Sequence, residues 1–123
     1  MKHLCFYFIA AALLSGCVSL TTPEQADLRR LEAQGVTTLS PQSDWERPAK
    51  PFAAGALNLL PGFGNFYLAA GNGGVKDQYL VGAVNLILWP WSVLWGVPEA
   101  AIDAETINER ELIWHYRLQE SEK

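Results

Sequence analysis

The sequence predicts an all-α protein, and three observations lead to this fold class. Two long stretches without a charged residue, Phe52 to Val75 and Gln78 to Pro98, are each long enough to form apolar helices joined at a polar tip. After Pro98, apolar side chains recur at the spacing of one helix face. The segment from Thr21 to Gly35 carries helix start and stop signals. The 123 residues are enough for one small domain.

The chain begins with an export signal. Met1-Lys2-His3 is a short basic start, an uncharged run follows from Leu4 to Leu14, and small residues precede Cys17. The run is shorter than the roughly 20 residues of a spanning helix, so it reads as a cleavable secretory signal. Leu14-Ser15-Gly16-Cys17 resembles the bacterial lipobox. That resemblance implies a signal peptide at residues 1–16, a diacylglycerol thioether on Cys17 and an acyl chain on its new amino group. The alternative is an ordinary signal, or an uncleaved anchor with an incidental cysteine.

Composition excludes several function classes. The net charge is −4, and removal of Lys2 with the signal leaves about −5 without a basic cluster, so no nucleic-acid partner is expected. Cys5 lies in the signal and Cys17 carries the lipid, which leaves no thiol for zinc, disulfide or redox chemistry. His115 is then the single remaining histidine. We therefore expect no metal and no cofactor other than the covalent lipid.

Residues 17–51 are expected to hold the lipidated N-terminus, a short amphipathic helix and a tether. Thr22 is placed to cap the helix, Pro23 suits its first position, Gln25 completes a capping box and Gly35 ends it.

The tether is the expected form of Val36 to Pro51, which carries three prolines among Thr, Ser, Gln and Asp. Trp45, followed by Arg47 and Lys50, is predicted to lie at the level of the lipid headgroups.

Residues 52–98 form the predicted apolar helical hairpin, and both of its runs are interrupted. Leu60-Pro61-Gly62-Phe63-Gly64 breaks the first and Trp89-Pro90-Trp91 kinks the second, because proline lacks an amide donor. In lipid the freed backbone groups need partners, so the breaks should face each other or a shared polar pocket. The residues assigned to this structure are Asn58, Pro61, Gly62, Gly64, Asn65, Asn85, Pro90, Gly96, Ala100 and Ala104.

Three arrangements of this hairpin stay open. Its runs can cross the membrane, they can lie in the interface as half-helices, or they can form a buried helical pair in a soluble domain, since asparagines are costly in lipid unless paired. Trp89, Trp91 and Trp95, together with Trp45, are predicted to be interfacial anchors rather than a ligand-stacking wall.

Residues 99–123 are predicted to form an amphipathic helix starting at Pro98 and Glu99, which suit a first turn. Gly96, Ala100 and Ala104 recur every four residues, a spacing that lets helices approach closely. Glu99 and Asp103 lie one turn apart. Paired carboxylates can perform acid–base chemistry, but at a helix start we interpret them as capping charges, so no catalytic residue is assigned.

Pro61-Gly62-Phe63-Gly64-Asn65-Phe66-Tyr67-Leu68-Ala69, followed by a second apolar run with Gly82, Trp95 and Asp103, resembles the TM2-type membrane hairpin. The likeness covers residues 56–103. It departs from the family pattern in lacking a His-Arg pair ahead of Phe66-Tyr67 and in having Ala69 where glycine is usual, and Trp95 is further from Asp103 than in the family, so that Glu99 is a second match to that acid. The resemblance implies a two-helix membrane element and no particular chemistry.

The sequence therefore predicts a lipid-anchored protein of the bacterial cell envelope with a structural or accessory role and no enzymatic activity. Its expected partners are membrane lipid and either an envelope protein or a second copy of itself. The alternative is a binding module that holds a lipid or an apolar peptide between the broken helices. Val18 after the lipidated cysteine favours the outer membrane, whereas two uncharged helices favour the inner one, so the choice of membrane stays open.

Replacing Cys17 by Ser tests the lipobox. The variant is expected to accumulate as an unprocessed precursor and to lose metabolic labelling with palmitate, because the sulfur that carries the lipid is gone. It should still sediment with membranes, since the apolar hairpin is a second and independent attachment. Normal processing and labelling of Cys17→Ser would show that the Leu-Ser-Gly-Cys sequence is incidental.

Overall fold

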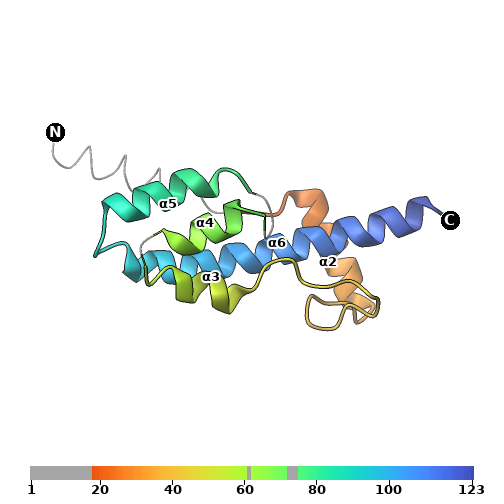
Figure 1. The fold of residues 1–123 in the computed structure, drawn as a ribbon. Helices are drawn as coiled ribbons and strands as arrows, with labels where there is room; N and C mark the ends of the chain where they lie inside the picture. The colour runs from red at the N-terminus through yellow and green to blue at the C-terminus, as the bar shows by residue number, and fades with distance from the viewer. Residues whose placement is uncertain (1–17, 61, 72–74) are drawn as a thin grey trace.

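The computed structural model describes residues 18–60, 62–71 and 75–123, and within these residues it is entirely helical (Figure 1). The all-α fold class is thereby confirmed. The helices are α2 (Thr22–Ala33), α3 (Pro51–Leu57), α4 (Phe63–Ala69), α5 (Gln78–Ile87) and α6 (Val93–Ser121). The predicted signal peptide, Cys17, Pro61 and the Asn72-Gly73-Gly74 part of the predicted turn lie outside the described residues.

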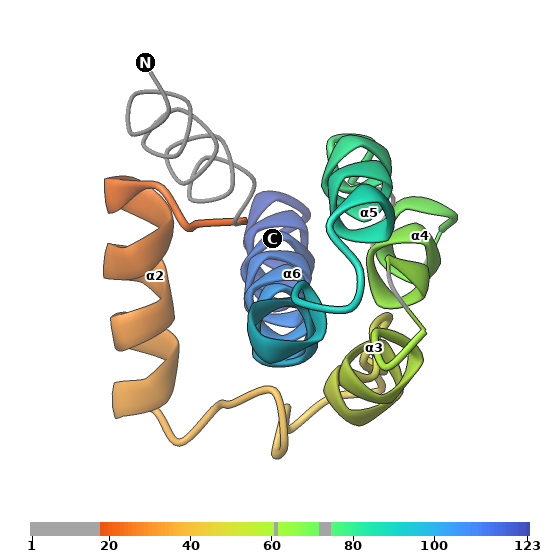
Figure 2. The same cartoon turned by 90° about the vertical axis from the view of Figure 1, so that its left-hand side faces the viewer.

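Helix α6 is the axis of the molecule. Its 29 residues extend for about 43 Å. The short helices α3, α4 and α5 surround its N-terminal half, and α2 crosses its C-terminal half (Figures 1 and 2). Helices α3 and α4 pack on α6 and on each other, and α5 packs on α4. The chain thus forms a four-helix module at one end of α6 and a two-helix arrangement at the other.

Helix α2 begins one residue earlier than the sequence predicts. Its N-cap is Thr21 rather than Thr22, because the Glu24 carboxylate accepts hydrogen bonds from the Thr21 amide (2.7 Å) and hydroxyl (2.8 Å), and so replaces Gln25 as the capping partner. These bonds, led by the one from the backbone amide, lower the pKa of Glu24. Gly35, at φ +79°, follows the end of the helix as predicted.

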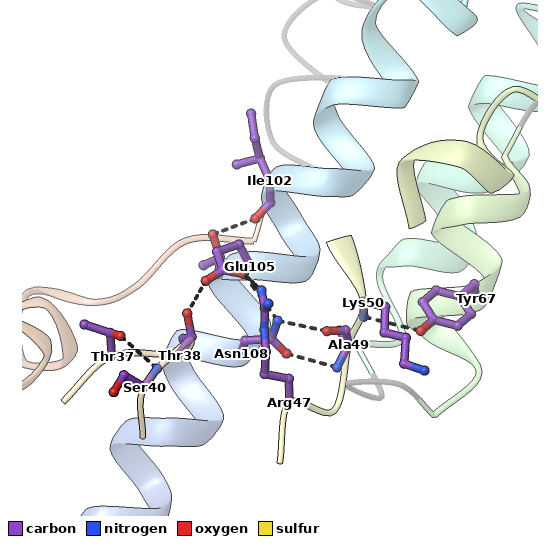
Figure 3. A network of polar contacts seen from close by, with 11 residues as sticks. Thr37, Thr38, Ser40, Arg47, Ala49, Lys50, Tyr67, Ile102, Glu105 and Asn108 are labelled. Atoms are coloured by element: carbon purple, nitrogen blue, oxygen red, sulfur yellow. Dashed lines mark hydrogen bonds and ion pairs between the residues drawn. The ribbon is translucent and has the colours of Figure 1, made fainter. Parts of the chain in front are cut away.

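The segment between α2 and α3 is not the free tether that its prolines suggested. Ala49 is fully buried, and the Asn108 side chain on α6 both donates to its carbonyl and accepts from its amide, at 2.9 Å each. Nearby, Glu105 of α6 binds Arg47 and Thr38 (Figure 3). Polar side chains of α6 therefore hold this segment along the helix.

Trp45 packs against the protein. Its half-buried ring contacts the buried cluster Leu31, Val36, Leu112 and Ile113, which joins α2 to the C-terminal half of α6. A position of its exposed part at the lipid headgroups stays a prediction.

Both apolar runs are broken where the sequence predicted. The first divides into α3 and α4, with Gly62 at φ +79° between them, and the second into α5 and the start of α6. As a result, no helix in the described parts of the chain combines the length and hydropathy needed to cross a bilayer.

Two glycines make the first break possible. A Cβ atom on Gly64 would lie 2.0 Å from the carbonyl oxygen of Ala54, so α4 can approach α3 this closely only with glycine there. Gly62 has a positive φ that disfavours other residues, and a Cβ there would lie 2.1 Å from the carbonyl oxygen of Gly82. The break is therefore a packed element rather than a loose loop.

The predicted start of the last helix at Pro98 is wrong. Helix α6 begins at Val93 and runs through Pro98 without ending. A proline at the sixth helical position forfeits one bond near the helix end, and the close contacts of Gly96, Ala100 and Ala104 favour continuation. Asp103 is consequently far from the helix N-terminus, so capping is the wrong interpretation of this carboxylate.

Small residues bring the helices of the module together. Ala100 and Ala104 of α6 are fully buried, in a cluster with Ala49, Ala54 and Leu68. Gly96 is also buried, one turn before Ala100. The every-fourth-residue pattern thus lies on the face of α6 that packs against its neighbours.

Adjacent alanines of α6 provide a matched test of this packing. Ala100→Leu is expected to destabilise the fold by about 1–3 kcal/mol, because no space exists for the added atoms. Ala101→Leu, whose side chain lines an open groove, should leave stability nearly unchanged. Limited proteolysis and chemical denaturation in detergent measure both. Equal resistance of the two variants would show that Ala100 is not at a tight interface.

Candidate functional site

A network of buried side-chain amides lies at the centre of the four-helix module. The Asn65 side-chain oxygen accepts from the amide groups of Asn58 and Asn85, at 2.9 Å each, and its own amide donates to the Gln78 side-chain oxygen at 2.6 Å. These residues come from α4, the end of α3 and both ends of α5, and all are essentially inaccessible to solvent. Asn65 therefore connects three elements through one side chain.

The network continues to Val18, the first residue that the structure describes. The Gln78 amide donates to one oxygen of the Asp103 carboxylate, and the Val18 backbone amide donates to the other at 3.0 Å. Val18 directly follows Cys17, so Asp103 binds the peptide next to the predicted lipid attachment. Further along, Arg110 donates to the Ser19 carbonyl at 2.5 Å. The backbone at Val18 and Ser19 is thereby fixed to α6.

At its other end the network supplies hydrogen-bond partners for backbone groups at both helix breaks. Asn58 accepts from the Gly64 amide at 2.8 Å and donates to the Gly96 carbonyl at 2.5 Å. Asn85 accepts from the Trp95 indole at 3.0 Å, and Ser92 donates to the Asn85 carbonyl at 2.6 Å. The sequence predicted that asparagines would serve the groups freed by the breaks, and the contact of Asn58 with the Gly64 amide at the start of α4 is of this kind.

Burial changes the chemistry of Asp103. Desolvation raises its pKa, and the hydrogen bonds from Gln78 and Val18 oppose this only in part. No ion pair of Asp103 with a cation occurs in the described part of the chain. The carboxylate thus acts as a hydrogen-bond acceptor that is held in place at an electrostatic cost.

Gln78 and Ser92 were missed by the sequence reasoning, and Asp103 was given another role. A signal existed for Gln78: it precedes Asn85 by seven residues within one predicted apolar helix, which places both side chains on one helix face. Ser92 and Asp103 carry no comparable pattern, because their contacts depend on how the helices pack.

The outer surface of the module is apolar where its two helix breaks lie. The α3–α4 and α5–α6 connections lie at the same end of the molecule, the left-hand end of Figure 1 and the end facing the viewer in Figure 2. Ile87 is 80% exposed, Leu94 75% and Trp91 70%. The other exposed large side chains in or beside these connections are Leu59, Leu60, Phe63, Leu86 and Trp89. We call this group with Ile87, Trp91 and Leu94 the apolar end.

The tryptophans predicted as interfacial anchors in the second apolar run have two different surroundings. Trp89 and Trp91 belong to the apolar end, whereas Trp95 is half-buried with its indole nitrogen in the amide network.

Charged groups gather at the opposite end, where Arg117 pairs with Asp27 at 2.5 Å, Arg110 with Glu24 at 3.2 Å, and Arg30 with Glu120. The molecule is therefore apolar at one end and ionic at the other.

An apolar groove of about 390 Å³ lies between α3 and α6. Its walls carry no polar surface, and its lining residues are Pro51, Phe52, Gly55, Ala56, Leu59, Val97 and Ala101. The groove follows α3 from Pro51, which comes directly after the N-cap Lys50, to the apolar end at Leu59. It is of a size typical of small-molecule sites.

Asp103, Glu99 and His115, the titratable residues considered in the sequence, have separate surroundings in the described part of the chain. Asp103 is bound to Gln78 and Val18, and Glu99 is half-buried one turn earlier. His115 is twelve residues further along α6, about 18 Å away, with its Nε2 atom 3.0 Å from the Gln119 amide nitrogen. Among the described residues, no three His, Cys, Asp or Glu side chains gather as metal ligands would.

No family model matches the chain, and neither the curated proteins nor the solved structures contain a match. The resemblances to the lipobox and to the TM2-type hairpin therefore remain predictions.

The buried carboxylate predicts a specific pH dependence. Because folding raises the pKa of Asp103, the folded state binds this proton more tightly than the unfolded state. Its contribution to stability is therefore greatest below the unfolded pKa, near 3.8, and is lost as the pH rises through the folded value. The difference in unfolding free energy between the parent and Asp103→Asn should shift in favour of the parent on going from pH 7 to pH 4.

Denaturation of both proteins across this range provides the measurement, since the other carboxyl groups titrate in both and cancel in the difference. A difference that does not change with pH would place Asp103 in contact with solvent.

Proposed function

We propose that the mature protein is a lipid-anchored protein of the bacterial cell envelope, with a structural or accessory role and no catalytic activity. Its four-helix module is embedded in one leaflet of the membrane, with the apolar end inserted first. The covalent lipid on Cys17 and this module form two attachments on the same body. The observation that carries the proposal is the distribution of polarity, with amides inside the module and large apolar side chains outside it.

This distribution suits a lipid environment. A domain surrounded by water places its large apolar side chains inside, whereas here Ile87, Trp91 and Leu94 are exposed and Asn65 is fully buried. In hydrocarbon, every backbone and amide group must be paired internally, as the network of Asn65 achieves for the two breaks. Exposed apolar patches of this kind mark interaction surfaces.

The dimensions of the module support embedding to the depth of one leaflet. Helix α5 has ten residues and a length of about 15 Å, which is half of the roughly 30 Å hydrocarbon thickness. Charges flank the module at its other side, at Lys50 before α3 and at Lys76 and Asp77 before α5. These positions place the charged side chains at headgroup level when the apolar end reaches the middle of the bilayer.

The predicted lipid attachment at Cys17 is compatible with the same depth of the module in the membrane. Asp103, which binds the Val18 amide, is ten residues from the start of α6, again about 15 Å from the apolar end. A lipid on Cys17 would therefore leave the protein near the headgroup boundary, where acyl chains begin. The hydrogen bond of Val18 to Asp103 supports a common orientation for the two attachments.

A second candidate function is that of a binding module for a lipid or an apolar peptide. The observation that favours it is the groove between α3 and α6, whose lining is entirely apolar. The partner in the leading proposal, an envelope protein or a second copy, would contact the ionic end formed by α2 and the C-terminal half of α6.

Cysteine accessibility tests the embedding, because lipidation of Cys17 and loss of the signal would leave no free thiol. Ile87→Cys at the apolar end and Leu118→Cys at the ionic end replace exposed apolar side chains of similar size. In vesicles of purified protein, a membrane-impermeant maleimide should label position 118 and leave position 87 at least tenfold less reactive.

Detergent provides the control. Dissolving the vesicles should make both thiols react at similar rates, which shows that the difference depends on the bilayer. A high ratio of lipid to protein removes self-association as a cause of protection. If position 87 reacts as fast as position 118 in intact vesicles, the apolar end is not in the membrane and the embedding model is wrong.

A further inference from the structure

The groove between α3 and α6 has a direction as well as a volume. Along α3 it extends from Pro51 to Leu59, which is about 12 Å, and on α6 it is floored by Val97 and Ala101. At one end the lining begins with Pro51, directly after Lys50, the N-cap of α3, and at the other it reaches the apolar end at Leu59. In the proposed orientation the groove is parallel to the acyl chains of the surrounding leaflet, with its charged end at the headgroups.

We infer that this groove binds one acyl chain of a membrane phospholipid, whose phosphate is bound by the Lys50 ammonium group. This assignment rests on the proposed embedding and adds a specific ligand site to it. Three features support it: the wholly apolar lining, the volume of about 390 Å³, and the cation at the headgroup end.

Lys50 is suited to this role by its surroundings. Its side chain is exposed, while its backbone amide donates to the Tyr67 hydroxyl at 3.4 Å, so the main chain is fixed next to α4 (Figure 3). No described carboxylate forms an ion pair with it. By contrast, the neighbouring Arg47 is paired with Glu105. Lys50 is therefore the cation that remains for an anionic headgroup at this opening.

The occupant is a free phospholipid rather than the lipid on Cys17. In Figure 2 the chain enters at the red segment on the side of α6 opposite to α3. Val18 is held there by Asp103 and Ser19 by Arg110. An acyl chain attached to Cys17 would have to pass around α6 to reach the groove.

Native mass spectrometry of the full-length processed protein, released from detergent micelles, tests the site. The probes are palmitoyl-oleoyl phosphatidylglycerol and the diacylglycerol with the same chains. The parent should retain one phosphatidylglycerol. Ala101→Phe and Ala56→Trp, which fill the groove from its two walls, should reduce retention of both probes at least tenfold, whereas Ile102→Phe, an exposed neighbour outside the groove, should not.

The charge is tested separately. Lys50→Gln should weaken retention of phosphatidylglycerol severalfold and leave the diacylglycerol unaffected, and Lys76→Gln, which lies away from the groove, should change neither. Circular dichroism establishes that each variant is folded, and Ala56 is exposed enough for its replacement to be tolerated.

Three results would overturn the inference. Retention by Ala101→Phe and Ala56→Trp equal to that by Ile102→Phe would place the lipid elsewhere. An empty parent that gains one phospholipid on Cys17→Ser substitution would identify the protein's own lipid as the occupant. A co-purified apolar peptide in place of lipid would identify a peptide site. None of these depends on membrane insertion, and failure of the embedding model appears instead as rapid labelling of Ile87→Cys in vesicles.

Discussion

The side-chain amide of Asn65 is the interaction on which the module depends. One oxygen accepts from Asn58 and Asn85, and one nitrogen donates to Gln78, so three segments are joined through buried side chains. A hydrogen bond contributes about 0.5–1.5 kcal/mol net, but a buried partner left unpaired costs about 1–3 kcal/mol. Loss of the Asn65 side chain would leave several such partners at once. The network therefore specifies one arrangement of the helices more strictly than apolar contacts could.

This requirement becomes stronger if the module lies in lipid. Surrounding acyl chains are as apolar as leucine, so the hydrophobic effect does not hold helices together there, and close packing and polar contacts must do so. Both are present. The backbones of α3 and α4 approach closely at Gly64, and Gly96 leaves room for the side chains of Asn58 and Asn85. Asn58 bonds both the Gly64 amide and the Gly96 carbonyl. The small residues and the amides are thus two parts of one packing solution.

Local signals in the sequence were sufficient for the helical class, the end of α2 at Gly35 and the breaks in both apolar runs. Each of these depends on a few adjacent residues, above all on proline and glycine. Predictions that depended on distant contacts were less successful. The segment containing Ala49 was expected to be a tether because its partner Asn108 is fifty-nine residues away, and Asp103 was expected to be a capping residue because the start of α6 at Val93 is set by packing. Asn58, Asn65 and Asn85 could be grouped from the sequence, since an unpaired polar side chain in an apolar run needs a partner wherever it lies, and the three side chains bond one another.

Because α6 is one helix, it connects two regions that are stabilised in different ways. Around its N-terminal half, contacts are made by buried amides and small residues, which salt does not screen. Around its C-terminal half, α2 is held by the cluster of Leu31, Val36, Leu112 and Ile113 and by ion pairs such as that of Arg117 with Asp27. These ion pairs are exposed to water and are weakened by salt. Conditions that loosen α2 should therefore leave the four-helix module intact, and the Val18 contact with Asp103 belongs to the module side of this division. Under the proposed embedding, the region outside the membrane would be able to rearrange to meet a partner while the predicted attachment near Cys17 keeps its place.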